Sequence, residues 1–258
     1  ECSLRFYFRY GVGLKETKEV EEIAEASTFG LILHKSLEVL YGPFINQIIQ
    51  IKNIEEALLK IEPTVDQSFV SFFDGNEPVG KSLLQKEVIK VYVKKLLKND
   101  IQFITKLSTQ NQVLSILKLE EEFSAPLTIK INGEDTTVFI KGKIDRIDSY
   151  NNMIRVIDYK SSVKDSDQFV FSDFENLFND KNYNKQFQLL LYSWLLYKNN
   201  FCQANQLMIG IIPFKVFINE PKYLLDSGKK PFVFSDEFLM DFENELKLFV
   251  MQIFNHSS

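Results

Sequence analysis

The chain has 258 residues, of which 45% are hydrophobic and 14% aromatic, and its formal net charge is −5 at pH 7. This composition excludes a disordered protein, and the length suffices for a sizeable core. The charge argues against an indiscriminately basic protein that coats nucleic acid. Two cysteines are too few for a disulfide framework, which favours a cytoplasmic protein. No apolar run is long enough to cross a membrane, so we expect no membrane partner. The abrupt ends predict a piece excised from a longer chain.

The first half of the chain is predicted to be helical, after an N-terminal segment rich in arginine and aromatic residues. Residues 28–41 carry apolar residues and His34 at helical spacing, and Gly42-Pro43 ends this helix. Further helices are predicted at 53–73 and 81–98. The last of these carries a stripe of lysines four residues apart: Lys86, Lys90, Lys94 and Lys98. Such a stripe is usually a solvated helix face, and the alternative is that it follows a phosphate backbone, as Arg5 and Arg9 also could.

From about residue 113 the hydrophobic period changes to two, which indicates strands. Four strands are expected in an antiparallel meander: 113–123, 125–131, 136–148 and 152–160. A helix at 184–199, a strand at 207–217 and a closing helix at 235–254 follow. Together these elements predict one α/β domain around a mixed sheet, with a helical portion at 28–110, a sheet core at 113–217 and the closing helix.

The stretch GKIDRIDSYNNMIRVIDYKSS, residues 142–162, places charged residues in apolar strands. Asp158 and Lys160 are two apart, so they share a face of their strand, and pairing through the turn brings Asp145 close to them. Two carboxylates suit Mg²⁺ or Mn²⁺, and a neighbouring ammonium can stabilise charge on a phosphate. These residues therefore suit metal-assisted phosphodiester hydrolysis. The alternative is a salt-bridged hairpin, in which these acids pair with Lys160, Arg146 or Lys143.

The same motifs resemble the PD-(D/E)xK nuclease superfamily, in its RecB/AddB-like branch. Members of that branch carry G-x-h-D-R-h-D and h-h-D-Y-K-[ST] strands, an upstream G-x-x-h-H-x-x-h-E helix and a later Q-x-x-x-Y helix. Here GLILHKSLE at 30–38 and QLLLY at 188–192 supply the two helical motifs, so all four occur in order. The resemblance covers nearly all of residues 1–258. It implies a restriction-endonuclease-like fold, a mixed central β-sheet flanked by helices.

The resemblance also implies a role for each matching residue. The metal ligands would be His34, Asp145, Asp158 and the backbone carbonyl of Tyr159. Lys160 would position the attacking water and stabilise the transition state, so Lys160, Asp158 and Asp145 form the expected catalytic group. Gln188 and Tyr192 would contact the substrate. Glu38 is expected to support His34 or Lys160 rather than to bind metal.

Several of these residues have plainer alternatives. His34 would be a core histidine, and Tyr192 would pack into the core with Gln188 at its edge. Arg146 is expected to pair with an acid such as Asp148, with phosphate contact as the other option. The acidic run Glu120–Glu122 is expected to be mostly solvated, although one member could approach the site from the adjacent strand.

The function expected on this basis is a Mg²⁺- or Mn²⁺-dependent DNA nuclease. It would be an exonuclease of a helicase–nuclease or DNA-repair system, acting on single-stranded DNA or duplex ends with a helicase domain or subunit as partner. One alternative is a catalytically silent nuclease-like module that binds DNA or acts as a scaffold; another is a metal-dependent hydrolase of small molecules. Many relatives hold a four-cysteine iron–sulfur cluster, but with only Cys2 and Cys202 no cluster is expected within this chain.

Overall fold

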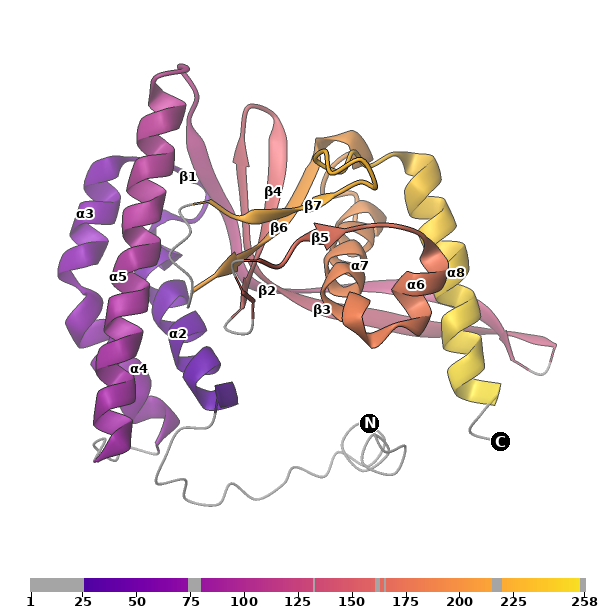
Figure 1. Cartoon of the computed structure of the whole chain (residues 1–258), viewed down its shortest axis with the longest axis horizontal. Coiled ribbons are helices and arrows are strands. Elements are labelled where there is room, and N and C mark those ends of the chain that lie inside the picture. The colour runs from indigo at the N-terminus through magenta and orange to yellow at the C-terminus, as the bar shows by residue number, and fades with distance from the viewer. Residues whose placement is uncertain are drawn as a thin grey trace.

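The computed structural model describes residues 26–73, 80–131, 133–160, 163–164, 166–214 and 220–255. Cys2, Arg5, Arg9 and the aromatic residues between them lie outside the described residues. A seven-stranded sheet runs through the middle of the molecule with helices on both sides (Figure 1). This architecture confirms the predicted mixed sheet flanked by helices.

The N-terminal helices cover one side of the sheet. They and the short elements between them are α2 (Ala26–Tyr41), a 3₁₀ turn (Gly42–Phe44), β1 (Gln47–Ile49), α3 (Ile51–Leu59), α4 (Ile61–Phe72) and α5 (Lys81–Ser108). The helix predicted at 53–73 is two helices, because Pro63 has no N–H to donate to the carbonyl of Leu59 and is tolerated only in a first turn. Helix α5 is ten residues longer than predicted: it continues from residue 98 to Ser108.

The strands are ordered β1-β2-β3-β4-β6-β7-β5. Their bounds are β2 (Leu114–Ile131), β3 (Glu134–Tyr150), β4 (Met153–Lys160), β5 (Phe169–Val170), β6 (Leu207–Pro213) and β7 (Lys222–Leu225). The predicted four-segment meander is wrong in one respect: 113–123 and 125–131 form the single strand β2. Pro126 does not end this strand, because β2 pairs there with β3 and β1 pairs only with residues 114–116. The parallel pairing of β4 with β6 makes the sheet mixed.

The C-terminal helices cover the other side of the sheet. They are α6 (Phe174–Asn179), α7 (Asn184–Lys198) and α8 (Asp236–Asn255), with 3₁₀ turns at Lys181–Tyr183 and Ala204–Gln206. Helix α8 is capped at its N-terminus, since the hydroxyl of Ser235 accepts a hydrogen bond from the Phe238 N–H at 3.1 Å.

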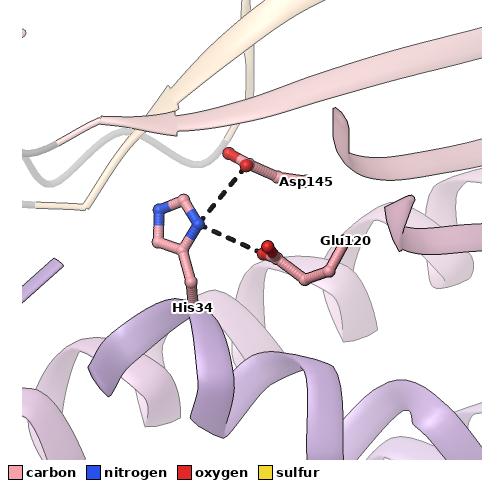
Figure 2. A group of neighbouring side chains, drawn as sticks. All are labelled: His34, Glu120 and Asp145. Atoms are coloured by element: carbon pink, nitrogen blue, oxygen red, sulfur yellow. Dashed lines mark hydrogen bonds and ion pairs between the residues drawn. The ribbon is translucent and has the colours of Figure 1, made fainter. Parts of the chain in front are cut away.

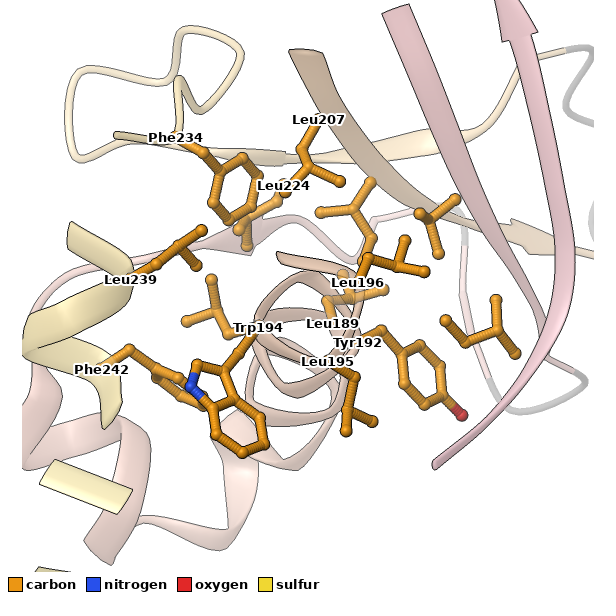
Figure 3. Close-up of a cluster of buried hydrophobic side chains, with 14 of the residues drawn as sticks. Leu189, Tyr192, Trp194, Leu195, Leu196, Leu207, Leu224, Phe234, Leu239 and Phe242 are labelled. Carbon is orange, nitrogen blue, oxygen red and sulfur yellow. The ribbon is translucent and has the colours of Figure 1, made fainter. Parts of the chain in front are cut away.

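Alternation along β4 separates two hydrophobic cores. Val156 packs into the cluster beneath α7 and α8, where Trp194 and Phe242 are fully buried (Figure 3). Ile157 and Tyr159 pack into the second cluster, beneath α2, α4 and α5. Because each face of the strand is covered, the polar residues in these strands are held in defined surroundings.

The turn of the β3–β4 hairpin sets the register of the site. Asn151 and Asn152 have φ of 50° and 61°, the left-handed geometry of a two-residue hairpin turn. From this turn the two strands pair as far as Arg146 and Ile157. The next residues, Asp145 and Asp158, therefore lie where the strands begin to separate.

Candidate metal centre

His34 projects from α2 toward the open end of the β3–β4 hairpin. Its Nδ1 lies 3.2 Å from Oε1 of Glu120 and 3.3 Å from Oδ1 of Asp145 (Figure 2). Its Nε2 lies 3.2 Å from the carbonyl oxygen of Tyr159. Both ring nitrogens thus face oxygen atoms. Burial alone would lower the pKa of His34, but Asp145 and Glu120 together raise it to about 10, so this imidazole is a cation at neutral pH.

Asp145 joins the two strands where they part. Its Oδ2 accepts a hydrogen bond of 2.7 Å from the backbone N–H of Tyr159, while Oδ1 faces His34. The carboxylate is therefore fixed by the neighbouring strand and directed toward the histidine. It is buried, with 8% of the residue exposed.

Asp158 is the most deeply buried acid of the group, with 1% of the residue exposed. Lys160 Nζ lies 3.1 Å from its Oδ1, but neither carboxylate oxygen makes a well-oriented hydrogen bond to any described residue. Burial, followed by repulsion from Asp145, raises the pKa of Asp158 to about 7. A buried carboxylate with a free oxygen beside a second carboxylate is a donor set that a divalent cation would complete.

Glu120 is the acidic residue that the sequence did not single out. It lies on β2 with φ of 51°, a left-handed conformation that is costly for a residue with a side chain. Burial acts to raise its pKa, but His34 and Lys143 lower it, so Glu120 is ionised. Lys143 Nζ lies 2.7 Å from Oε2 of Glu120. In the run Glu120–Glu122 only backbone geometry distinguishes the member that faces the site.

The ligand atoms of His34, Glu120 and Asp145 all lie within 4.8 Å of one another. Carboxylate oxygens with one imidazole suit a hard or borderline divalent cation. Asp158 and the Tyr159 carbonyl border the same space. The chain's residues therefore fit the metal that the sequence predicts: His34 and Asp145 of the four expected ligands lie in this group with Glu120, and the Tyr159 carbonyl faces the other ring nitrogen of His34. Their catalytic roles stay predictions.

Gln188 and Tyr192 lie one turn apart on α7. Gln188 Nε2 donates a hydrogen bond of 2.6 Å to the Tyr192 hydroxyl. Burial, followed by the charge of Asp158, raises the pKa of Tyr192, which places the phenol near that carboxylate. Glu38, by contrast, accepts a hydrogen bond from Lys35 at 2.9 Å.

Arg146 lies in a buried network on the other side of β3. Only 1% of its side chain is exposed, and its guanidinium contacts Asp100 at 2.6 Å and Asp148 at 2.8 Å. Asp148 also binds Arg155 through both carboxylate oxygens, at 2.7 Å each. The expected pairing with Asp148 is present, and this burial gives Arg146 a structural role in place of a substrate contact.

Two lysines of the α5 stripe are paired with acids of the neighbouring helix α4. Lys86 Nζ and Lys90 Nζ each lie 3.1 Å from Oδ1 of Asp66, and Lys90 also contacts Glu62. Lys94 and Lys98 are exposed. The stripe is therefore partly neutralised.

Fold and site together define a protein of the metal-dependent nuclease class. The family model described as the PD-(D/E)XK nuclease superfamily matches residues 1–236. The chain belongs to this superfamily. No curated protein and no solved structure shows significant similarity to it. Within the part of the chain that the structure describes, every helix is too short or too polar to span a bilayer.

Proposed function

We propose that the protein is a Mg²⁺- or Mn²⁺-dependent deoxyribonuclease of the RecB/AddB-like branch, which hydrolyses phosphodiester bonds. The observation that supports this most is the convergence of His34, Glu120 and Asp145 within 4.8 Å, beside Asp158, whose buried Oδ2 has no partner among the described residues. Buried acids left without partners are costly, and a functional site is the usual reason for keeping them.

In this proposal His34, Asp145, Asp158 and the Tyr159 carbonyl hold the ion, with Glu120 as a further ligand. The ion, when bound, supplies Lewis-acid polarisation of the phosphodiester and of a water molecule. A ligating histidine must be neutral, so His34 would give up its imidazolium proton on binding the ion.

Lys160 is placed to act on the reacting groups. Its side chain is 29% exposed, so the ammonium reaches solvent while Asp158 anchors it at 3.1 Å. There it donates hydrogen bonds to the attacking water and to the phosphate as negative charge builds in the transition state. Gln188 and Tyr192, held by their mutual hydrogen bond, contact the strand being cut.

The biological setting is inferred from the resemblance of the motifs alone. We infer an exonuclease that works in the cytoplasm on single-stranded DNA or duplex ends, in a helicase–nuclease or DNA-repair system. A helicase domain or subunit would deliver the strand.

The test is a cleavage assay on end-labelled single-stranded and duplex DNA with Mg²⁺, Mn²⁺ or EDTA. We expect cleavage with either metal and none with EDTA. Stepwise shortening from a labelled end supports the exonuclease, and an internally cut pattern contradicts it. Lys94→Gln, which removes an exposed lysine of α5, is the control for Lys160→Ala. If Lys160→Ala cleaves as well as the parent, the nuclease role of this hairpin is wrong and a DNA-binding module is the better function.

A further inference from the structure

The longest part of the sheet is a two-stranded arm, residues 122–143, formed by β2 and β3 beyond the end of β4. Its tip extends past α7 and α8 (Figure 1). One face of the arm is covered: Phe123 and Leu127 are buried, and a Cβ on Gly142 would lie 2.7 Å from Cδ1 of Leu195 in α7. The hydrophobic cluster beneath α7 and α8 accounts for this face.

The other face of the arm is open. The odd-numbered residues of β3 lie on it: Phe139 is 66% exposed, and the Lys141 and Lys143 side chains are 61% and 58% exposed. Side chains two apart on a strand form a row. The row ends at the metal centre, because Lys143 Nζ lies 2.7 Å from Oε2 of Glu120.

We propose that this open face is the path along which an unpaired nucleic-acid strand reaches the metal centre, with Lys141 and Lys143 against phosphates and Phe139 stacked on a base. The inference rests on the proposed function and adds the route and the strandedness of the substrate. Asp145 lies six positions after Phe139, so the row is roughly 20 Å long at about 3.3 Å per residue. Cations beside an exposed ring are the combination that proteins use to bind single strands.

The ion pair of Lys141 leaves this lysine available for a phosphate. Lys141 contacts Glu122 at 3.2 Å, but both side chains are more than half exposed, and such surface pairs contribute little. A phosphate can therefore replace Glu122 as the partner of Lys141. Beyond Phe139, the hydroxyls of Thr128 and Thr137 lie 3.4 Å apart and extend the face with polar groups.

The exposed phenylalanine decides between an unpaired strand and a duplex. A ring that projects from a sheet can stack only on a base that is free of its partner strand. A fully paired duplex offers only phosphates and groove edges at that position. Binding of a duplex is therefore expected to be insensitive to Phe139.

The test is binding of a fluorescent single-stranded DNA oligonucleotide to the whole chain in EDTA, followed by anisotropy at several salt concentrations. Phe139→Ala is expected to weaken binding about tenfold, the effect of losing one base-stacking contact. Lys141→Gln is expected to reduce the salt slope by about 0.7, the value for one phosphate contact on a single strand. Leu84→Ala and Lys94→Gln on α5 are the matched controls, since Leu84 is 65% exposed and Lys94 is also exposed. Melting curves confirm that each variant is folded.

Unchanged single-strand affinity in Phe139→Ala and an unchanged salt slope in Lys141→Gln would overturn the path, and the proposed nuclease would stand if the parent still cleaves. A loss in the α5 controls alone would move the path to α5. An equal loss of duplex binding in Phe139→Ala would overturn the single-strand part. If Phe139→Ala instead abolishes self-association and leaves DNA binding intact, the face is a protein interface. A parent that neither binds nor cleaves DNA would refute both proposals.

Discussion

Two pairs of buried acids meet at the β3–β4 hairpin, Asp100 of α5 with Asp148 of β3 and Asp145 of β3 with Asp158 of β4, and the two pairs have opposite surroundings. Asp100 and Asp148 are held by guanidinium groups, with Arg146 and Arg155 at 2.6–2.8 Å. Asp145 and Asp158 have no arginine among the described residues. The nearest cations to the second pair are His34 and Lys160.

The contrast shows what each pair is for. Acids paired with arginine are satisfied, so their network fixes α5 to the sheet and adds no reactivity. Tyr41 extends it by donating a hydrogen bond of 2.5 Å to Asp100. In the pair without arginine, Oδ2 of Asp158 has no partner among the described residues, and that costs stability unless a cation is supplied from outside. One pair is structural and the other has the character of a binding site.

The largest expected effect, and the sharpest test of the contrast between the two pairs, is on DNA cleavage. Asp158→Asn is expected to reduce Mg²⁺-dependent cleavage about 1,000-fold or more, and Lys160→Ala by about 100- to 1,000-fold, because each loses a group that acts on developing charge. Asp158→Asn should also lose metal affinity, whereas Lys160→Ala should retain it. Single-turnover rates and Mn²⁺ titrations separate the two. The double variant should be no slower than the slower single variant, and an additive loss would contradict a shared site.

The structural pair should respond in stability. Asp148→Asn is expected to lower the free energy of unfolding by about 3–5 kcal/mol, because the buried guanidinium groups of Arg146 and Arg155 lose their counter-charge. Unfolding in urea measures this change in the free energy of unfolding. Asp158→Asn is the matched control, with the same chemical change at the other pair, and should leave the metal-free protein as stable or more stable. If the two variants lose equal stability, the two pairs of acids do not differ in their structural role.

Metal should stabilise the folded protein only through the pair without arginine, Asp145 and Asp158. At a free Mn²⁺ concentration of about 100 times its Kd, the folded protein is expected to gain about 2.7 kcal/mol, visible as a higher melting temperature. The gain should persist in Lys160→Ala and vanish in Asp158→Asn. Absence of any shift at millimolar Mn²⁺ in the parent would count against an intact site.

The smallest expected effect is on how the stability of the metal-free protein depends on pH. The folded-state pKa of Asp158 is raised to about 7, so between about 4 and 7 the folded state holds a proton that the unfolded chain releases, and stability falls as pH rises. The pKa of His34 is raised to about 10, so its stabilising charge is complete below about 6.5 and is lost as pH approaches 10. The lowered pKa of Glu120 has the opposite effect on stability: its contribution is lost only as pH falls below the usual pKa of a glutamate.

Melting temperatures in EDTA should therefore decline steadily from pH 5 to pH 9. Asp158→Asn should flatten the acidic half of this decline and His34→Gln the alkaline half. A rising curve in the parent would mean that the raised pKa values are not those of the folded protein.

Much of the hairpin was predictable because its signals are local. The alternation of apolar and polar residues predicts the two strands, and the Asn-Asn turn predicts their register. This register places Asp145 close to Asp158. The sequence did not predict that β2 is a single strand, because Pro126 is a turn signal in most settings. The strand continues through Pro126 because β2 pairs there only with β3, so the absent N–H of the proline costs no hydrogen bond to a second strand. The break at Lys60 was missed because a proline can belong to a first turn or interrupt a helix.

The rest of the site depends on contacts that no local pattern carries. Glu120 is one of three adjacent glutamates, and its selection follows from backbone rotation at one residue. Asp100 lies forty-six residues from Arg146, so the network that buries this arginine follows from how α5 packs on the sheet. The short strands β1, β5 and β7 were not predicted, since strands of two to four residues offer too few positions for alternation.

The left-handed backbone at Glu120 has a consequence for laboratory evolution. Glycine adopts this φ without strain, so a selection for heat resistance that ignores cleavage should favour Glu120→Gly. The winning clone would lack the carboxylate that faces His34. At position 120, the residue that favours thermal stability therefore differs from the residue that binds metal. Thermostable variants of this chain should be screened for cleavage before they are combined.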